Sequence, residues 1–305
     1  MRQSASTVIV VAIGVLLTVA VIVRSFSHRA SSRGRELENV LALKQRLTTN
    51  PNDDWSLSRL MDIAAGKTEW ATVRNDAIQT LGQVGAEPKL SGRVGSFLMK
   101  TTRDSSSQAR EAACDALGDM GSVAAPAVDD ILEAMTSAPD SSIEAGCARA
   151  LGRTGANPES VVPALAMLVP NRDPLTHSPH FIRGEEVVAL AAFGERAMPA
   201  VPRLELALAD PDLEYRRKVV SALSKIDPEN VRLPEASISL LQAKDFLARN
   251  IGLLAIRTCC SNGMGAGIAQ ALAGATCDAN KENADLARSI LAGAHTGVRA
   301  KCLEC

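Results

Sequence analysis

Aromatic residues are scarce in this sequence. Phe, Trp and Tyr make up only 3% of the 305 residues, as five Phe, two Trp and one Tyr. A core must therefore be built from Ala, Leu, Val and Ile. Small aliphatic residues favour closely packed helices over a sheet, which usually also needs aromatic residues. Because 46% of the residues are hydrophobic, a large core can still be buried, and we expect an all-α protein.

An excess of charge of one sign is also lacking. The chain has 33 basic and 34 acidic residues, and its formal net charge is −1. Proteins that bind nucleic acids usually carry a basic excess, which neutralises phosphates. The balance therefore argues against a nucleic-acid partner, although a local basic patch stays open.

Cysteines form no readable disulfide framework, because their number is seven and their spacing is irregular. Cys114 and Cys147 fall inside helical patterns, where small buried cysteines are ordinary. We therefore expect free thiols and a reducing compartment. Cys302 and Cys305 form a C-x-x-C, but no second pair stands at zinc-site spacing. A metal or redox site formed by these two residues with Cys277 is therefore not the expected reading.

One long hydrophobic run lies at the N-terminus. Residues 8–23 contain no charge, and the run is close to the shortest helix that crosses a bilayer, about 17 residues. We expect an uncleaved single-pass anchor at 8–24, after a short tail at 1–7. The alternative is a cleaved signal peptide, since small residues occur around 25–27.

Basic residues flank this run unequally. Arg24, Arg29, Arg33 and Arg35 follow it, whereas Arg2 precedes it. The positive-inside rule therefore places the bulk of the chain in the cytoplasm. A linker and a short helix are expected at 25–52.

A repeat occupies the remainder of the chain. The form Leu-Gly-x-x-Gly occurs at 81–85, 117–121 and 151–155, and weaker copies end at 194, 227 and 260, so the steps between closing positions range from 33 to 39 residues. Apolar residues before each closing position share one face of a helix. Glycine is the usual stop after a helix, and the prolines that follow suit the start of the next one. Each unit therefore reads as helix, turn, helix.

The pattern Val/Ile-Arg-x-x-Ala, then Ala-Leu-Gly-x-x-Gly, then Pro-Ala-Val resembles HEAT-like repeats of the bacterial kind that also occurs in phycobilisome-lyase-type proteins. The resemblance implies an α-solenoid of about six helix pairs over 53–295, with a tail at 296–305. Tetratricopeptide repeats share the period but need large aromatics in nearly every unit, and ankyrin's Thr-Pro-Leu-His is missing.

The resemblance also implies a ladder of Asp–Arg pairs that links neighbouring units. We assign this role to Asp104 with Arg110 and to Asp210 with Arg216, since each Asp precedes its Arg by the same interval. The simpler reading is that each charge caps or pairs within its own turn.

In HEAT-like arrays the second helix of each pair lines the concave surface, and one ridge of these helices is the expected partner-binding groove. The alternative is that its acids pair with the arginines of the next unit. The mixed charges suit a protein or peptide partner. The groove residues are Gln79, Gln83, Glu111, Asp115, Asp119, Arg149, Arg153, Arg217 and Lys225.

No nucleophile–base pair, phosphate loop or metal cluster is evident, so we expect no enzyme activity and no cofactor. His177 and His180 lie in a proline-rich loop at 170–181, where a third metal ligand is missing nearby. The function expected is a membrane-anchored scaffold for protein–protein interaction. A bilin-lyase-type or other HEAT-like enzyme, or a regulatory subunit of one, is the alternative.

Overall fold

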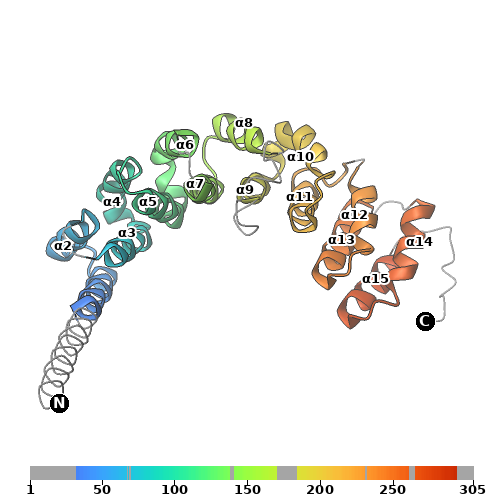
Figure 1. The fold of residues 1–305 in the computed structure, drawn as a ribbon, viewed down its shortest axis with the longest axis horizontal. Coiled ribbons are helices and arrows are strands. Elements are labelled where there is room, and N and C mark those ends of the chain that lie inside the picture. Colours follow the sequence, from blue (N-terminus) through green and yellow to red (C-terminus); the bar gives the residue numbers. More distant parts are fainter. Residues whose placement is uncertain are drawn as a thin grey trace, which may run out of the picture. The chain divides into compact units, whose positions relative to one another are not determined.

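The computed structural model describes residues 32–66, 68, 70–137, 141–169, 184–230, 232–260 and 265–293. Within these ranges every regular element is a helix, and no strand occurs. The expected all-α helical repeat architecture is confirmed for this part of the chain (Figure 1).

Several expected segments lie outside these ranges: the tail at 1–7, the anchor at 8–24, the loop at 170–181 and the tail at 296–305. None of the helices in the described ranges has the length and apolar character that a bilayer span requires.

The chain divides into two compact units, residues 1–97 and 98–305, whereas the sequence indicated one array. The first unit contains a helix at 32–49 and then α2 (Asp54–Ala64), α3 (Ala71–Gly85) and most of α4 (Pro88–Thr101). Its helix α2 begins where the array was expected to start, because the Asp53 carboxylate accepts a hydrogen bond from the Ser56 main-chain N at 3.0 Å. This bond holds the pKa of Asp53 below its usual range.

The second unit continues as pairs of helices. Its elements are α5 (Ser107–Asp119), η1 (Gly121–Ala127), α6 (Val128–Ser137), α7 (Ser141–Thr154), α8 (Pro158–Leu168), α9 (Glu185–Phe193), η2 (Gly194–Ala200), α10 (Val201–Ala207), α11 (Leu213–Ile226), α12 (Leu233–Leu241), α13 (Phe246–Cys259), α14 (Ala266–Ala275) and α15 (Lys281–Gly293).

The closing positions of the repeat fall where helices end. Gly121 and Gly155 follow α5 and α7 with φ angles of +63° and +61°, a left-handed conformation that glycine adopts without strain. The 3₁₀ helices η1 and η2 begin at two closing glycines, Gly121 and Gly194, and lead into α6 and α10. Three prolines that were expected at helix starts lie inside an element instead: Pro126 in η1, Pro199 in η2 and Pro163 in α8. Helix α8 begins at Pro158.

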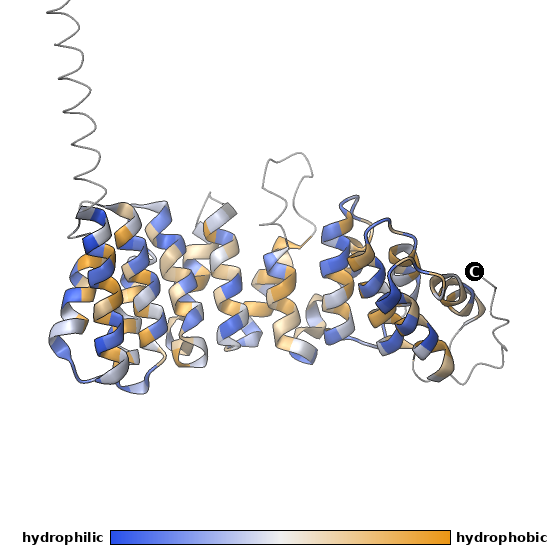
Figure 2. Ribbon diagram, turned by 90° about the horizontal axis from the view of Figure 1, so that it is seen from below, coloured by the Kyte–Doolittle hydropathy of each residue, from blue (hydrophilic) through white to orange (hydrophobic). Residues whose placement is uncertain are grey.

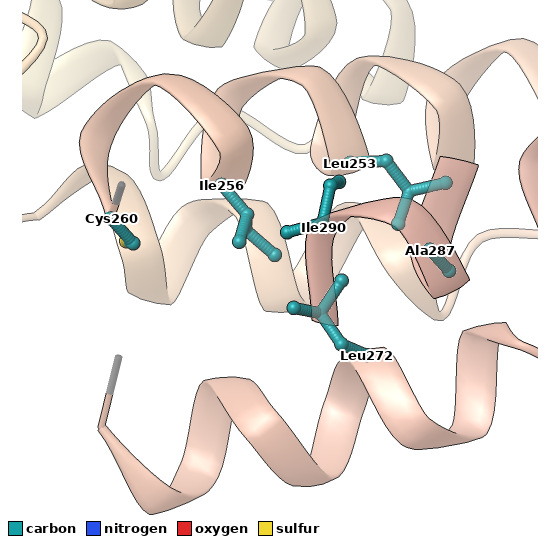
Figure 3. Packing of buried hydrophobic residues seen from close by; sticks show 6 residues of the cluster. All are labelled: Leu253, Ile256, Cys260, Leu272, Ala287 and Ile290. Carbon is teal, nitrogen blue, oxygen red and sulfur yellow. The ribbon is translucent and has the colours of Figure 1, made fainter. Parts of the chain in front are cut away.

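Each helix buries an aliphatic stripe, and Figure 2 shows hydrophobic and hydrophilic residues alternating along the helices. At the C-terminal end, Leu253 and Ile256 of α13 pack with Leu272 of α14 and with Ala287 and Ile290 of α15 (Figure 3). The array therefore closes on a packed pair, α14 and α15, beyond the last registered unit.

Small residues bring the helices of successive units close together. A Cβ atom added to Gly118 of α5 would lie 2.9 Å from the Cα of Ala150 in α7, a distance that side chains essentially never show. The glycine after Leu in the repeat motif therefore serves close packing between units, in addition to the closing glycine that ends the helix.

A disulfide joins the same two helices, contrary to the expectation of free thiols. Cys114 of α5 and Cys147 of α7 are bonded across a sequence separation of 33, and their Cα atoms are 4.9 Å apart. Cys277 is disulfide-bonded as well. The sequence could not show the pairing, because the register between α5 and α7 brings the two sulfurs together.

Candidate functional site

The odd-numbered helices of the second unit, α5 to α15, form one layer, and the even-numbered helices α6 to α14 form the other. Each odd-numbered helix contacts the next one along the chain of units. Within this unit the odd-numbered layer follows the inner side of the curve drawn in Figure 1. We call it the inner layer. It carries the groove residues that the sequence predicted between Glu111 and Lys225.

Charges on the inner layer pair between neighbouring helices. Arg149 of α7 donates from Nε and Nη2 to the Asp115 carboxylate of α5, at 3.0 to 3.2 Å. One turn further, Arg153 Nη1 donates to Asp119 Oδ1 at 2.7 Å. These four predicted groove residues therefore pair with one another across neighbouring units, which is the alternative that the sequence left open.

The pairing continues across the next two helices. Arg149 Nη1 lies 3.9 Å from a Glu185 carboxylate oxygen of α9, and Lys218 Nζ of α11 lies 3.8 Å from the other oxygen. Asp115, Arg149, Glu185 and Lys218 therefore alternate in sign over four successive inner helices. Glu185 and Lys218 were not among the predicted residues, because their partner helices are set by the fold.

An apolar side chain interrupts this charged layer on α9. Val188 is 48% exposed although it is aliphatic, and Ala192 is exposed one turn later. On the buried side of the same helix, Glu186 accepts a hydrogen bond from the Tyr215 hydroxyl at 3.2 Å. The middle of the inner layer thus offers an exposed apolar strip between paired charges.

The other predicted groove residues lie as follows. Arg217 of α11 pairs with Glu214 and lies 4.0 Å from Asp245. Lys225 is exposed near the end of α11, and Glu111 is half-buried on α5. Gln79 and Gln83 are exposed on α3 in the first unit.

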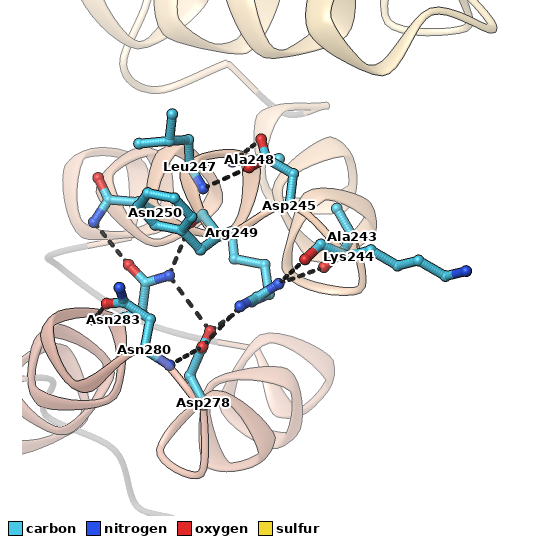
Figure 4. A network of polar contacts seen from close by, with 11 residues as sticks. Ala243, Lys244, Asp245, Leu247, Ala248, Arg249, Asn250, Asp278, Asn280 and Asn283 are labelled. Carbon is cyan, nitrogen blue, oxygen red and sulfur yellow. Dashed lines mark hydrogen bonds and ion pairs between the residues drawn. The ribbon is translucent and has the colours of Figure 1, made fainter.

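A polar network at the start of α13 contains an acid, Asp278, that was not among the predicted site residues. Arg249 donates to the Asp278 carboxylate from Nε at 2.6 Å and from Nη2 at 2.9 Å (Figure 4). The side chain of Asp278 is 2% exposed, and the residue precedes α15. Each partner shifts the other: the Arg249 hydrogen bond lowers the pKa of Asp278, and Asp278 raises the pKa of Arg249. The sequence signal was an Asp two residues before a helix cap, the position that Asp104 and Asp210 share.

The structure describes the following contacts for the residues of the two ladder pairs assigned from sequence. Arg110 Nη1 donates to the main-chain oxygen of Asp104 at 2.8 Å, and Arg216 Nη1 donates to Ser239 Oγ at 3.2 Å. The carboxylates of Asp104 and Asp210 accept from the main chain two residues later. Arg249 with Asp278 is a guanidinium–carboxylate pair that links neighbouring units at this position.

Cys259, the last residue of α13, and Cys260, which follows it, are free thiols with their sulfurs in contact. Burial raises the pKa of the Cys259 thiol, so at neutral pH it carries its proton. Within the described ranges, no group of three side chains of the metal-ligating type lies together. His177, His180, Cys302 and Cys305 lie outside these ranges.

Residues 95–176 match the family described as HEAT repeats. The fold is HEAT-like. This matched stretch contains α5, α7 and the Asp–Arg pairs between them. No curated protein matches the sequence.

Solved structures support the same fold. A HEAT-like repeats protein from the archaeon Thermococcus onnurineus aligns with a TM-score of 0.51 and 16% identity, over 77% of this chain and 97% of that one. The complex of CpcE and CpcF of phycocyanin lyase from a Nostoc species gives 0.50 and 19%, over 75% and 92%. Importin beta gives 0.54 and 15%, over 82% of this chain and 36% of its own. At these identities the likeness is one of fold.

Proposed function

We propose that this protein is a non-catalytic scaffold that binds a protein or peptide partner on the inner layer of its second unit. The observation that carries the proposal is the lateral pairing of charges from Asp115 to Lys218. A layer whose charges are already balanced suits a partner of mixed charge, whereas a polyanion needs one sign along the whole surface.

The exposed side chain of Val188 supplies the apolar contact that such a partner needs. Interfaces draw most of their affinity from a few well-packed central residues, and polar residues around these exclude water. Val188 lies on α9, between the paired charges of α7 and α11. We infer that the partner places an apolar side chain against Val188 and polar groups against the flanking pairs.

The engagement of the acids also supports a binding role over catalysis. A general acid or base needs a carboxyl group that is free to meet a substrate. Asp115, Asp119 and Asp278 each accept hydrogen bonds from an arginine instead. The similarity to the phycocyanin lyase subunits extends to the fold alone, so a lyase activity has no residue-level support here.

We further propose that residues 8–24 hold the protein on a membrane and that the repeats face an oxidising compartment. Structural disulfides persist in such compartments and are rare in the cytosol. The Cys114–Cys147 bond therefore favours the side opposite to the one that the flanking arginines predict. Protease treatment of intact cells or spheroplasts tests this placement, and digestion of the repeats only after lysis of the membrane would contradict it.

A photo-crosslinking amino acid at position 188 tests the binding face. The full chain in its native membrane should form one discrete crosslinked product. A version without residues 1–24 should not form this product in the membrane fraction. The same crosslinker at position 206 is the control, since Leu206 is 64% exposed on α10 of the other layer and is therefore no less accessible than Val188. Equal products from both positions, or none from position 188, would overturn the proposed face.

Charge exchange separates binding from folding. Arg153→Glu alone puts two acids side by side, whereas Arg153→Glu with Asp119→Arg restores an ion pair of reversed direction. If the partner contacts the side chains at positions 119 and 153 directly, both variants should capture less partner than the unmodified chain. Full recovery in the double variant would show that only the pair's structural role matters. Recovery of a bound pigment or a stoichiometric metal with the purified chain would contradict the non-catalytic role.

A further inference from the structure

Arg216 lies at a repeated position of the array, and the equivalent residue one unit later, Arg249, binds a carboxylate there. Arg216 and Arg249 both lie four residues after the N-cap of their helix, which is Asp212 for α11 and Asp245 for α13. Arg249 uses Nη1 on the main-chain oxygens of Ala243 and Lys244, and it uses Nε and Nη2 on the Asp278 carboxylate. All of its donor edges are therefore engaged.

Arg216 lacks the corresponding carboxylate. Asp278 stands two residues before Asn280, the residue that precedes α15, and the equivalent place before α13 is two residues ahead of Asp245. That residue is Ala243, which has no acceptor in its side chain. As a result, Arg216 makes a hydrogen bond to Ser239 Oγ, and its Nε is buried without an acceptor. A buried donor without an acceptor is costly, because it has lost water and gained no partner.

A cleft lies beside this guanidinium. Its volume is about 210 Å³, and it is formed by the end of α10, by α11 and by α12. The polar residues of the lining are Arg216, Arg232, Glu235 and Ser239. The apolar residues of the lining are Leu208, Ala209, Val220, Ala236 and Leu240. One unit later, the lining of the equivalent cleft includes Leu241, Gln242 and Arg249. It also includes the Asp278 carboxylate, which has no counterpart beside Arg216.

We propose that this cleft binds a carboxylate that carries a short aliphatic group, in the way that the next unit binds its own Asp278. A guanidinium fork matches a carboxylate in a bidentate manner. Arg216 and Arg232 against Glu235 leave one positive charge, which suits a monoanion better than a phosphate. The volume is below the roughly 300 Å³ at which sites for drug-sized ligands begin, so the aliphatic part must be small.

The free acid and the C-terminus of a peptide share this chemistry, and the experiment distinguishes them. The full chain in detergent is titrated calorimetrically with isovalerate, with a tripeptide that ends in a leucine carboxylate, and with the same tripeptide as its C-terminal amide. We expect saturable binding of the peptide acid and none of the amide. Binding of isovalerate with equal affinity would assign the site to a free acid, and weaker binding by tenfold or more would assign it to a peptide end.

Two substitutions at one position provide the decisive comparison. Ala243→Asp builds the missing internal carboxylate, so it should abolish binding of the acid and raise the midpoint of thermal unfolding. Ala243→Asn has the same shape without the charge and should retain binding. Arg216→Gln should weaken binding at least tenfold, whereas Arg257→Gln, an exposed arginine of α13, should leave it unchanged.

Unchanged binding of the peptide acid to Ala243→Asp would overturn the proposed site. So would the absence of binding to the unmodified chain when the peptide acid is in 50-fold excess over the protein. A raised unfolding midpoint, measured on the same Ala243→Asp sample, excludes misfolding as the cause of lost binding. The result is independent of partner capture at Val188, which is measured by crosslinking on the inner layer.

Discussion

A Cβ atom added to Gly152 of α7 would lie 2.8 Å from the Cα of Ala189 in α9. The atoms of a backbone cannot move aside as the end of a flexible side chain can. Gly118 and Ala150 stand in the same relationship one unit earlier. The repeat therefore places a glycine on one helix against an alanine on the next, and this contact sets how closely the inner helices approach.

Gly152→Ala should destabilise the second unit by about 1–3 kcal/mol, because the added methyl forces α7 and α9 apart. Chemical denaturation monitored by circular dichroism measures the change. Gly267→Ala on α14 is the control: a Cβ there meets nothing within 4 Å, and alanine is the better helix former. An equal loss in both variants would remove the close contact as the explanation.

Replacing Cys114 and Cys147 together with alanine should lower the free energy of unfolding by about 3–4 kcal/mol, which is the loop-closure value for their separation of 33 residues. Urea denaturation of the variant and of the oxidised chain gives this difference. Adding a reductant should lower the stability of the unmodified chain more than that of the double variant, which keeps only the disulfide at Cys277. Equal sensitivity of both would indicate that the disulfide at Cys277 dominates.

The Arg249–Asp278 pair should make stability depend on pH at acidic values. The pKa of Asp278 is lowered in the folded chain, so its contribution is present above the unfolded value of about 3.9 and is lost as the pH falls through the folded value. At pH 7, Asp278→Asn should cost about 3 kcal/mol, because a mostly buried arginine loses its counterion. The difference from the unmodified chain should shrink as the pH falls below the unfolded value of about 3.9 and through the lowered folded value. A difference that is constant over this range would contradict the assignment.

The pair formed by Asp119 and Arg153 should contribute little to stability. Both side chains are partly exposed, and such pairs give about 0.2–1 kcal/mol. A double-mutant cycle with alanine at each position measures the coupling by urea denaturation. A coupling well above this range would mean that the pair serves the fold more than the binding surface.

Much of this architecture was predictable from short-range chemistry. The helix period, the glycines that follow α5 and α7 and the Asp53 cap depend on neighbouring residues, so the sequence determined the repeat and these ends of the helices. It also identified Asp115, Asp119, Arg149 and Arg153 as a group, because a fixed repeat length puts equivalent positions on adjacent helices.

The tertiary structure decided which of these groups meet. Whether the acids and arginines face a partner or each other depends on the lateral distance between helices, which contacts such as Gly152 with Ala189 fix. The same distance brings Cys114 to Cys147, and the loop before α15 brings Asp278 to Arg249. The sequence by itself determined a HEAT-like array with a mixed inner surface. Only the packing between units determined that this surface is a network of paired charges, with one arginine, Arg216, left beside an open cleft.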